Sequence, residues 1–119
     1  MGATLFDSEL KVMEVLWREG TLPAKRVVEI LGEEIGWNKN TTYTVLKKCV
    51  EKGYLRRDEP DFQCTPLITR EEACQDMTNE LIDKMFSGSS ELFFSAFLKG
   101  KGLDEKQVGR LMKMIQESK

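Results

Sequence analysis

Residues 38–57, NKNTTYTVLKKCVEKGYLRR, decide the fold. Asn38 is a type of residue that caps helices and Gly53 is one that ends them, so a helix is predicted over residues 39–52. Four residues at helical spacing form its predicted inward face: Thr42, Leu46, Cys49 and Val50. The predicted outward face is polar and basic, with Asn40, Thr41, Tyr43, Thr44, Lys47 and Lys48.

Basic charge is concentrated in this stretch. It holds six Lys and Arg residues and a single acid, Glu51, in a chain whose 18 basic and 20 acidic residues give a net charge of −2. A basic segment in an otherwise acidic chain is typical of a face that meets phosphate. Charge alone also describes a solvated basic helix. The hydroxyl and amide groups beside the charges favour nucleic acid, because they bond phosphate oxygens and base edges.

The flanking sequence predicts two earlier helices and a later ribbon. A helix over residues 7–19 is capped by Asp7 or Ser8 and ended by Gly20, and a second, over residues 24–35, follows Pro23 at a first helical position. After Gly53, two short strands at residues 54–57 and 62–65 are joined by a turn at residues 58–61. Three helices and a ribbon describe a winged helix-turn-helix domain, predicted for residues 1–67.

Residues 68–119 predict three further helices. Thr69 with Glu72 and Asp104 with Gln107 fit capping boxes, and Ser89 or Ser90 fits a cap between them. The segment 92–98 is apolar on most sides, so it needs more cover than two short helices provide. A second copy of the chain is the favoured cover, and a tail folded back on the first domain is the alternative. The predicted dimerisation residues are Met77, Leu81, Leu92, Phe93, Phe94, Phe97, Leu111 and Ile115.

Composition argues against an enzyme. The chain has no His, no C-x-x-C among its three Cys residues and no glycine-rich phosphate loop, so no metal, cofactor or catalytic triad is indicated. The thiols are expected to be reduced and mostly buried. A carboxylate site at Asp58, Glu59 and Asp61 is a weaker reading than a solvated turn. The Met residues of the tail are better explained as core filler than as the lining of a ligand pocket. No signal peptide or membrane span is indicated, so a cytoplasmic location is expected.

The function predicted from these features is sequence-specific binding of double-stranded DNA. The third helix fits a major groove while the ribbon lies on the backbone, and a homodimer then recognises a palindromic operator. The predicted contacts are Lys39, Asn40, Thr41, Tyr43, Thr44, Lys47, Lys48, Arg56 and Arg57. The alternative is a winged helix that binds protein rather than DNA, which predicts a more apolar third helix.

Three motifs carry a family resemblance. ELKVMEVLW at residues 9–17 resembles the opening helix of the penicillinase repressor and methicillin-resistance repressor family, with its E-x-x-V-M-x-x-[IL]-W pattern. WNKNTTYTVL at residues 37–46 is similar to that family's recognition helix, and KGYL at residues 52–55 resembles its entry to the wing.

The resemblance implies a homodimeric bacterial repressor in which Asn40, Thr41, Thr44 and Lys48 contact the operator and three C-terminal helices form the dimer. In the antibiotic-responsive members, a membrane sensor-protease signals cleavage of an Asn-Phe bond in the dimerisation region. The matching bond here is Ala96-Phe97, without the Asn. The copper-responsive branch uses C-x-C pairs near the C-terminus, and this chain has no Cys beyond Cys74.

Overall fold

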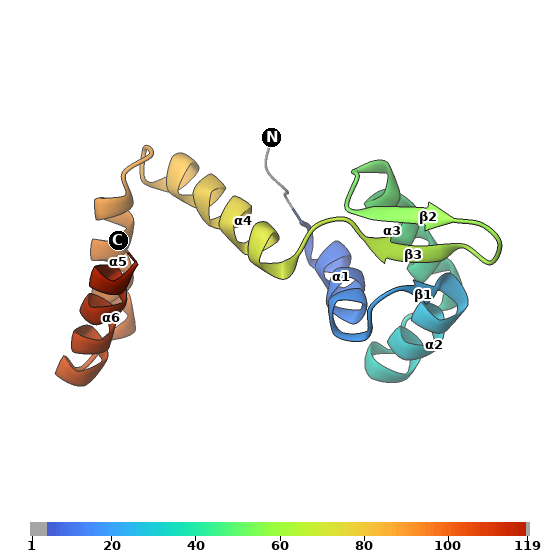
Figure 1. The fold of residues 1–119 in the computed structure, drawn as a ribbon, viewed down its shortest axis with the longest axis horizontal. Helices are drawn as coiled ribbons and strands as arrows, with labels where there is room; N and C mark the ends of the chain where they lie inside the picture. Colours follow the sequence, from blue (N-terminus) through green and yellow to red (C-terminus); the bar gives the residue numbers. More distant parts are fainter. Residues whose placement is uncertain (1–4, 119) are drawn as a thin grey trace. The chain divides into compact units, whose positions relative to one another are not determined.

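The computed structural model describes residues 5–118, which form six helices and three short strands. In chain order these are α1 (Asp7–Glu19), β1 (Leu22–Pro23), α2 (Ala24–Ile35), α3 (Lys39–Glu51), β2 (Leu55–Asp58), β3 (Gln63–Pro66), α4 (Arg70–Met85), α5 (Ser90–Lys101) and α6 (Glu105–Glu117), as labelled in Figure 1. The chain divides into two compact units, the first ending at Thr78 and the second beginning at Asn79. The predicted fold class, mainly helical with an N-terminal winged helix, is confirmed.

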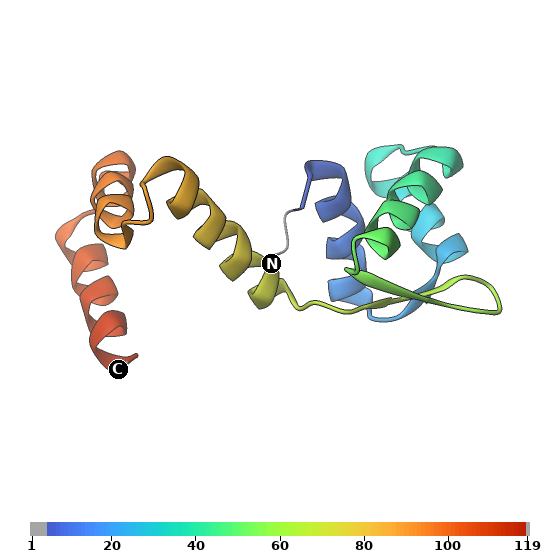
Figure 2. The same cartoon turned by 90° about the horizontal axis from the view of Figure 1, so that it is seen from above.

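The first unit is built around α3, which contacts α1, α2 and β2. Leu16, Leu31 and Leu46, one from each helix, are fully or almost fully buried. Figure 2 shows the three helices together, with the β2–β3 hairpin running along one side of them. The inward face predicted for α3 is buried at Thr42, Leu46 and Cys49. The core therefore fixes which face of α3 remains at the surface.

The sheet has three antiparallel strands in the order β1-β3-β2. In the register, β3 places Cys64 opposite both Leu22 of β1 and Arg57 of β2. The sequence predicted a ribbon of two strands and only an extended link before the second helix, so the count of two strands was wrong. A strand as short as β1 has no alternation to detect, and its pairing partner lies far along the chain.

The helix ends follow the predicted chemistry except at α1. The Asn38 side chain accepts a hydrogen bond from the Thr41 N–H, and Gly20 and Gly36 end α1 and α2. The predicted cap of α1 by Asp7 or Ser8 was wrong. Helix α1 instead begins one residue after Phe6, whose N–H donates to Glu9 Oε1 at 2.9 Å. Pro23 likewise lies one residue before α2 rather than in its first position.

Two of the three thiols lie in the core of the first unit. Cys49 and Cys64 are fully buried, Cys74 is exposed, and all three are free. Burial raises the pKa of the Cys49 thiol to about 12 and that of Cys64 to about 11. The two buried thiols therefore stay protonated at neutral pH and act as small apolar side chains.

The first turns of α4 belong to the first unit. The Trp17 indole N–H donates to the Ile68 carbonyl at 2.9 Å, and the Arg70 guanidinium lies 5.0 Å from the Trp17 ring. Ala73 is only 2% exposed and joins the core. The division into units falls within α4, whereas the composition change at Pro66 led us to expect a boundary at residues 67–68. Docking on Trp17 and burial of Ala73 explain the difference.

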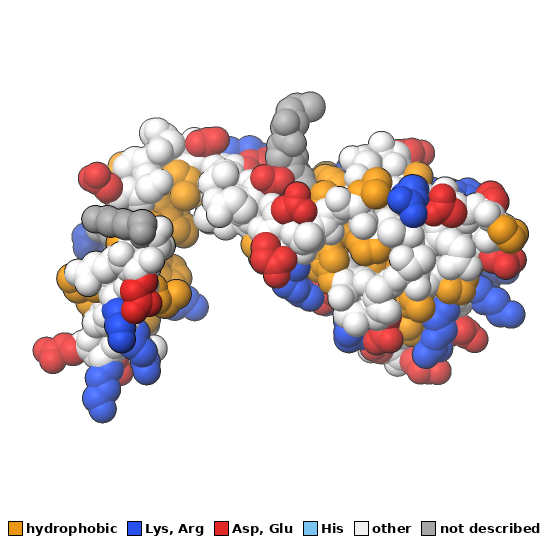
Figure 3. Space-filling view, in the orientation of Figure 1, with side chains coloured by type: hydrophobic (Ala, Val, Ile, Leu, Met, Phe, Trp, Pro, Cys, Tyr) orange, Lys and Arg blue, Asp and Glu red, His pale blue; other side chains and the backbone are white. Residues whose placement is uncertain are grey.

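Helices α4, α5 and α6 expose most of their large apolar side chains. The capping boxes of Thr69 with Glu72 and of Asp104 with Gln107 are present, and Ser89 caps α5. Neither α5 nor α6 has a buried residue, and Figure 3 shows apolar side chains at the surface over these helices. Of the predicted dimerisation residues, Phe93 and Leu111 are half-buried, and six are exposed: Met77, Leu81, Leu92, Phe94, Phe97 and Ile115.

One face of α6 is only partly covered within the single chain. Met112 and Ile115 are exposed, and Val108 and Leu111 are half-buried. The Ala96–Phe97 bond lies inside α5 with both side chains exposed. None of the helices within residues 5–118 has the length and apolar character needed to cross a bilayer.

Candidate nucleic-acid interface

Polar side chains near the start of α3 make local hydrogen bonds to its backbone. Asn38 caps the helix, the Thr42 hydroxyl donates to the Asn38 carbonyl at 3.3 Å, and the Thr44 hydroxyl donates to the Asn40 carbonyl at 2.8 Å. The Asn38 cap stabilises the start of the helix, and the two Thr hydroxyls use the carbonyl of the preceding turn as their acceptor. The oxygen of Thr44 keeps its lone pairs free to accept a hydrogen bond from a ligand. The first turn of α3 contains no acid, so its N-terminal end stays favourable to anions.

The structure brings most of the predicted contacts to the surface of one unit. All but one of the nine are exposed, namely Lys39, Asn40, Thr41, Thr44, Lys47, Lys48, Arg56 and Arg57. Tyr43 is half-buried, because its ring packs edge-on against Phe62 at 5.9 Å between centroids. The Lys39 ammonium lies 6.0 Å from the same Tyr43 ring.

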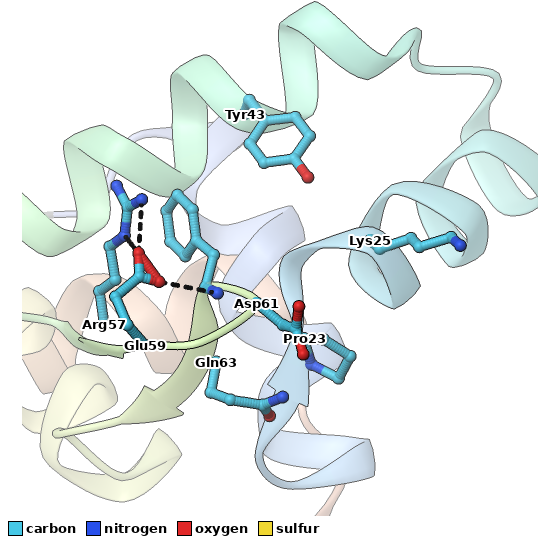
Figure 4. Close-up of a pocket in the computed structure, with 8 residues that line it drawn as sticks. Pro23, Lys25, Tyr43, Arg57, Glu59, Asp61 and Gln63 are labelled. Carbon is cyan, nitrogen blue, oxygen red and sulfur yellow. Dashed lines mark hydrogen bonds and ion pairs between the residues drawn. The ribbon is translucent and has the colours of Figure 1, made fainter.

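A hollow of about 690 Å³ lies between α2, α3 and the turn of the wing. Tyr43 points its hydroxyl toward this space, and Lys25 of α2 lies on the far side of it (Figure 4). Its lining comprises Pro23, Lys25, Tyr43, Arg57, Glu59, Asp61, Phe62 and Gln63. Lys25 was not singled out from the sequence. Its position in the first turn of α2, two residues after Pro23, is the signal that would have found it.

Lys52 is held by a buried carboxylate of α1. Its ammonium lies 2.8 Å from Glu9 Oε2 and 2.9 Å from Glu9 Oε1. The Glu9 side chain is 1% exposed and that of Lys52 is 34% exposed. The hydrogen bond to Glu9 raises the pKa of Lys52 above its ordinary value, so the Lys52 ammonium stays protonated at neutral pH. Lys52 thus fixes the end of α3 to α1, and its charge is already balanced.

Both arginines of the wing are also paired. The Arg56 Nε lies 2.8 Å from Asp58 Oδ2, and the Arg57 Nε and Nη2 lie 3.1 and 2.9 Å from Glu59 Oε1. The Arg57 guanidinium also lies 3.8 Å from the centre of the Phe62 ring. Asp58 and Glu59 come directly after the basic stretch, so counting charges only to Arg57 missed them.

The unpaired positive charge of the basic stretch therefore lies entirely on α3. Its cations Lys39, Lys47 and Lys48 form no ion pair within residues 5–118. Lys52, Arg56 and Arg57 are each matched by a carboxylate. The structure thus concentrates on one helix a charge that the sequence spread over 20 residues.

A three-helix unit whose third helix exposes hydroxyl, amide and ammonium groups, followed by a small antiparallel sheet, defines a winged helix-turn-helix protein. The family model described as penicillinase repressor matches residues 5–117. The chain belongs to the penicillinase repressor family, whose members are transcriptional repressors and not enzymes.

Similar proteins cover nearly the whole chain. The penicillinase repressor of Bacillus licheniformis is 24% identical over 115 residues, which are 95% of this chain and 90% of the relative. The methicillin resistance regulatory protein MecI of Staphylococcus aureus is 19% identical over 113 residues, with 93% and 92% covered.

Two solved structures resemble the N-terminal part. The solution structure of the DNA binding domain of the repressor BlaI matches with a TM-score of 0.54 and 28% identity, covering 60% of this chain and 93% of that one. The Bacillus licheniformis BlaI monomeric form in complex with the blaP half-operator matches with a TM-score of 0.52 and 27% identity, covering 60% and 90%.

Proposed function

We propose that this protein is a homodimeric repressor that binds a palindromic operator in the cytoplasm. In this proposal residues 1–67 bind DNA and residues 68–119 supply the dimer interface, with the first turns of α4 packed on the core of the DNA-binding domain. Helix α3 enters the major groove with Asn40, Thr41 and Thr44 toward the bases and with its lysines toward the phosphates. The observation that carries the proposal is the face of α3, where unpaired ammonium groups flank hydroxyl and amide groups.

The comparison with a half-operator complex supports the DNA partner. In that complex the similar chain is a monomeric form bound to half of an operator, and the match to it covers 60% of this chain at 27% identity. A half-operator implies that the complete operator of that relative holds two such units. Applied to this chain, two copies of α3 bind one DNA face at centres about 34–36 Å apart or a multiple of it.

The exposed apolar surface of the second unit supports the dimer. Large apolar side chains of α4, α5 and α6 that are between one-third and two-thirds exposed include Leu92, Phe94, Phe97, Met112 and Ile115. An apolar surface of this extent is uncommon on a monomer and typical of an interface between subunits. Covering it with a second copy satisfies the two-fold symmetry that a palindromic site requires.

Lys48→Ala is expected to weaken binding to operator and to random duplex by a similar factor, roughly threefold to tenfold, because an ammonium on phosphate carries no sequence information. The slope of log K against log salt should become shallower by about one unit. Fluorescence anisotropy at several salt concentrations measures both quantities. Lys106→Ala on α6 is the matched control and should change neither, and an unchanged slope for Lys48→Ala would remove Lys48 from the interface.

Thr44→Ala is expected to lower the ratio of the affinity for operator to the affinity for random duplex by roughly fivefold, because about one hydrogen bond to a base is lost. The loss should appear in operator binding alone, with the salt slope unchanged. Thr44→Ser keeps the hydroxyl and should retain most of the ratio. If both variants keep the full ratio, Thr44 positions the helix and does not read a base.

Selection of bound duplexes from a random pool tests the function as a whole. Recovery of a two-fold symmetric sequence is expected. A protein-binding winged helix would retain no duplex at low salt, and recovery of a single unrepeated half-site would contradict the dimer.

A further inference from the structure

The wing carries a charge pattern that the proposed function leaves unexplained. Its two arginines on β2 do not present an unpaired positive charge, because each is bonded to a carboxylate two residues further along the chain. Asp61 adds a further acid to the same turn. The segment from Arg56 to Asp61 therefore holds two cations and three anions, next to the face of α3 that is proposed to meet DNA.

We propose that Asp58 and Glu59 mask Arg56 and Arg57 and thereby set the affinity of this protein for DNA below what its cations would give. The inference rests on the proposed function. In this view the wing of the native protein contributes little phosphate binding, and α3 supplies most of it. The two carboxylates are then specificity-determining residues, because they suppress the part of binding that is independent of sequence.

The geometry of the two pairs explains why they persist near DNA. Each arginine has its carboxylate two residues away, Asp58 within β2 and Glu59 at the start of the turn, at 2.8–3.1 Å, so each pair forms without ordering any distant segment. Arg57 is held further by the Phe62 ring at 3.8 Å, and Glu59 also accepts the Phe62 N–H at 3.1 Å. Glu59 therefore links Arg57 to the backbone of the turn, and Figure 4 shows these Glu59 contacts as dashed lines.

Electrostatics gives the direction of the effect. To bind a phosphate, a wing arginine must exchange its carboxylate for the phosphate, and the released carboxylate then repels the DNA. The gain from the new pair is therefore largely cancelled, as it is not for an unpaired lysine. Removing the carboxylate charge while keeping its shape leaves the arginine free and abolishes the repulsion.

The Arg56–Asp58 pair offers the cleanest test, because neither side chain makes another hydrogen bond or ion pair that the structure describes. Four proteins are compared on random duplex: the native chain, Asp58→Asn, Arg56→Gln and the double variant. Asp58→Asn should bind roughly fivefold more tightly, with a salt slope steeper by about one unit. Arg56→Gln alone should change affinity by less than twofold, and adding it to Asp58→Asn should cancel the gain in slope.

The Arg57–Glu59 pair allows the same test, and Glu117, an acid far along the chain, provides the control. Glu59→Gln keeps the acceptor for the Phe62 N–H and should also tighten random binding and steepen the slope. Glu117→Gln at the end of α6 changes the net charge equally and should do neither. Circular dichroism spectra of the wing variants should match that of the native protein, which checks that they remain folded.

Two results would overturn the masking. One is an unchanged affinity for both carboxylate variants. The other is a tenfold loss for Arg56→Gln alone, which would show that the arginine already binds phosphate in the native protein. Failure of the proposed function is distinguishable, because then the native chain itself retains no duplex at low salt.

Discussion

Phe97→Asp is expected to dissociate the dimer and to lower the affinity for a complete operator by at least a hundredfold. Phe97 is 37% exposed on α5, and its ring stacks on Phe93 at 6.3 Å. A carboxylate placed in an apolar interface would be desolvated without a partner, which disfavours association strongly. Loss of the second copy of the chain removes the avidity gained when two DNA-binding domains bind one DNA, a factor of about 10²–10⁴.

Sedimentation and operator binding measured on the same samples check this expectation. Binding to a half-operator should stay near the native value, since the first unit is unaltered. Ser95→Asp places the same charge at an exposed polar position of α5 and is the matched control. A Phe97→Asp protein that still sediments as a dimer would show that α5 does not form the interface.

Leu46→Ala is expected to lower the free energy of unfolding by about 2–5 kcal/mol, the range for emptying a buried leucine site. Leu46 is fully buried on the inward face of α3, where α1 and α2 pack against it. The folded protein should still bind DNA, because the outward face of α3 is untouched. Chemical denaturation followed by circular dichroism gives the change in midpoint.

Leu67→Ala is the matched control, since Leu67 is 50% exposed and its truncation should cost less than about 0.5 kcal/mol. A loss below about 1 kcal/mol for Leu46→Ala would mean that α3 is not anchored by its apolar face. The polar face would then lack the rigid support that recognition of a groove needs.

Local chemistry was sufficient to predict the helices. Asn38, Gly20 and Gly36 mark their ends through bonds within a few residues, as do both capping boxes. Strand β1 was missed because two residues hold no pattern. The spacing of Met112 and Ile115 indicates an apolar face on α6, but spacing alone cannot show what covers that face, and both residues are exposed in the single chain.

Charge could be predicted in amount but not in availability. The sequence places Lys52 in the basic stretch, yet its partner Glu9 lies 43 residues away along the chain. Arg56 and Arg57 are balanced by the two acids that follow them. Only folding shows that, of the six cations in the basic stretch, Lys39, Lys47 and Lys48 are the ones without a carboxylate partner among the described residues.

The Trp17 indole of α1, which packs against the start of α4, gives the protein an intrinsic fluorescent reporter. Trp17 bonds the Ile68 carbonyl and lies under the Arg70 guanidinium, so its emission senses whether this helix start is docked. The chain has one other tryptophan, Trp37, which precedes the cap of α3. In a Trp37→Phe variant, the emission wavelength and quenching of Trp17 therefore report whether the start of α4 stays packed on α1, without any added dye.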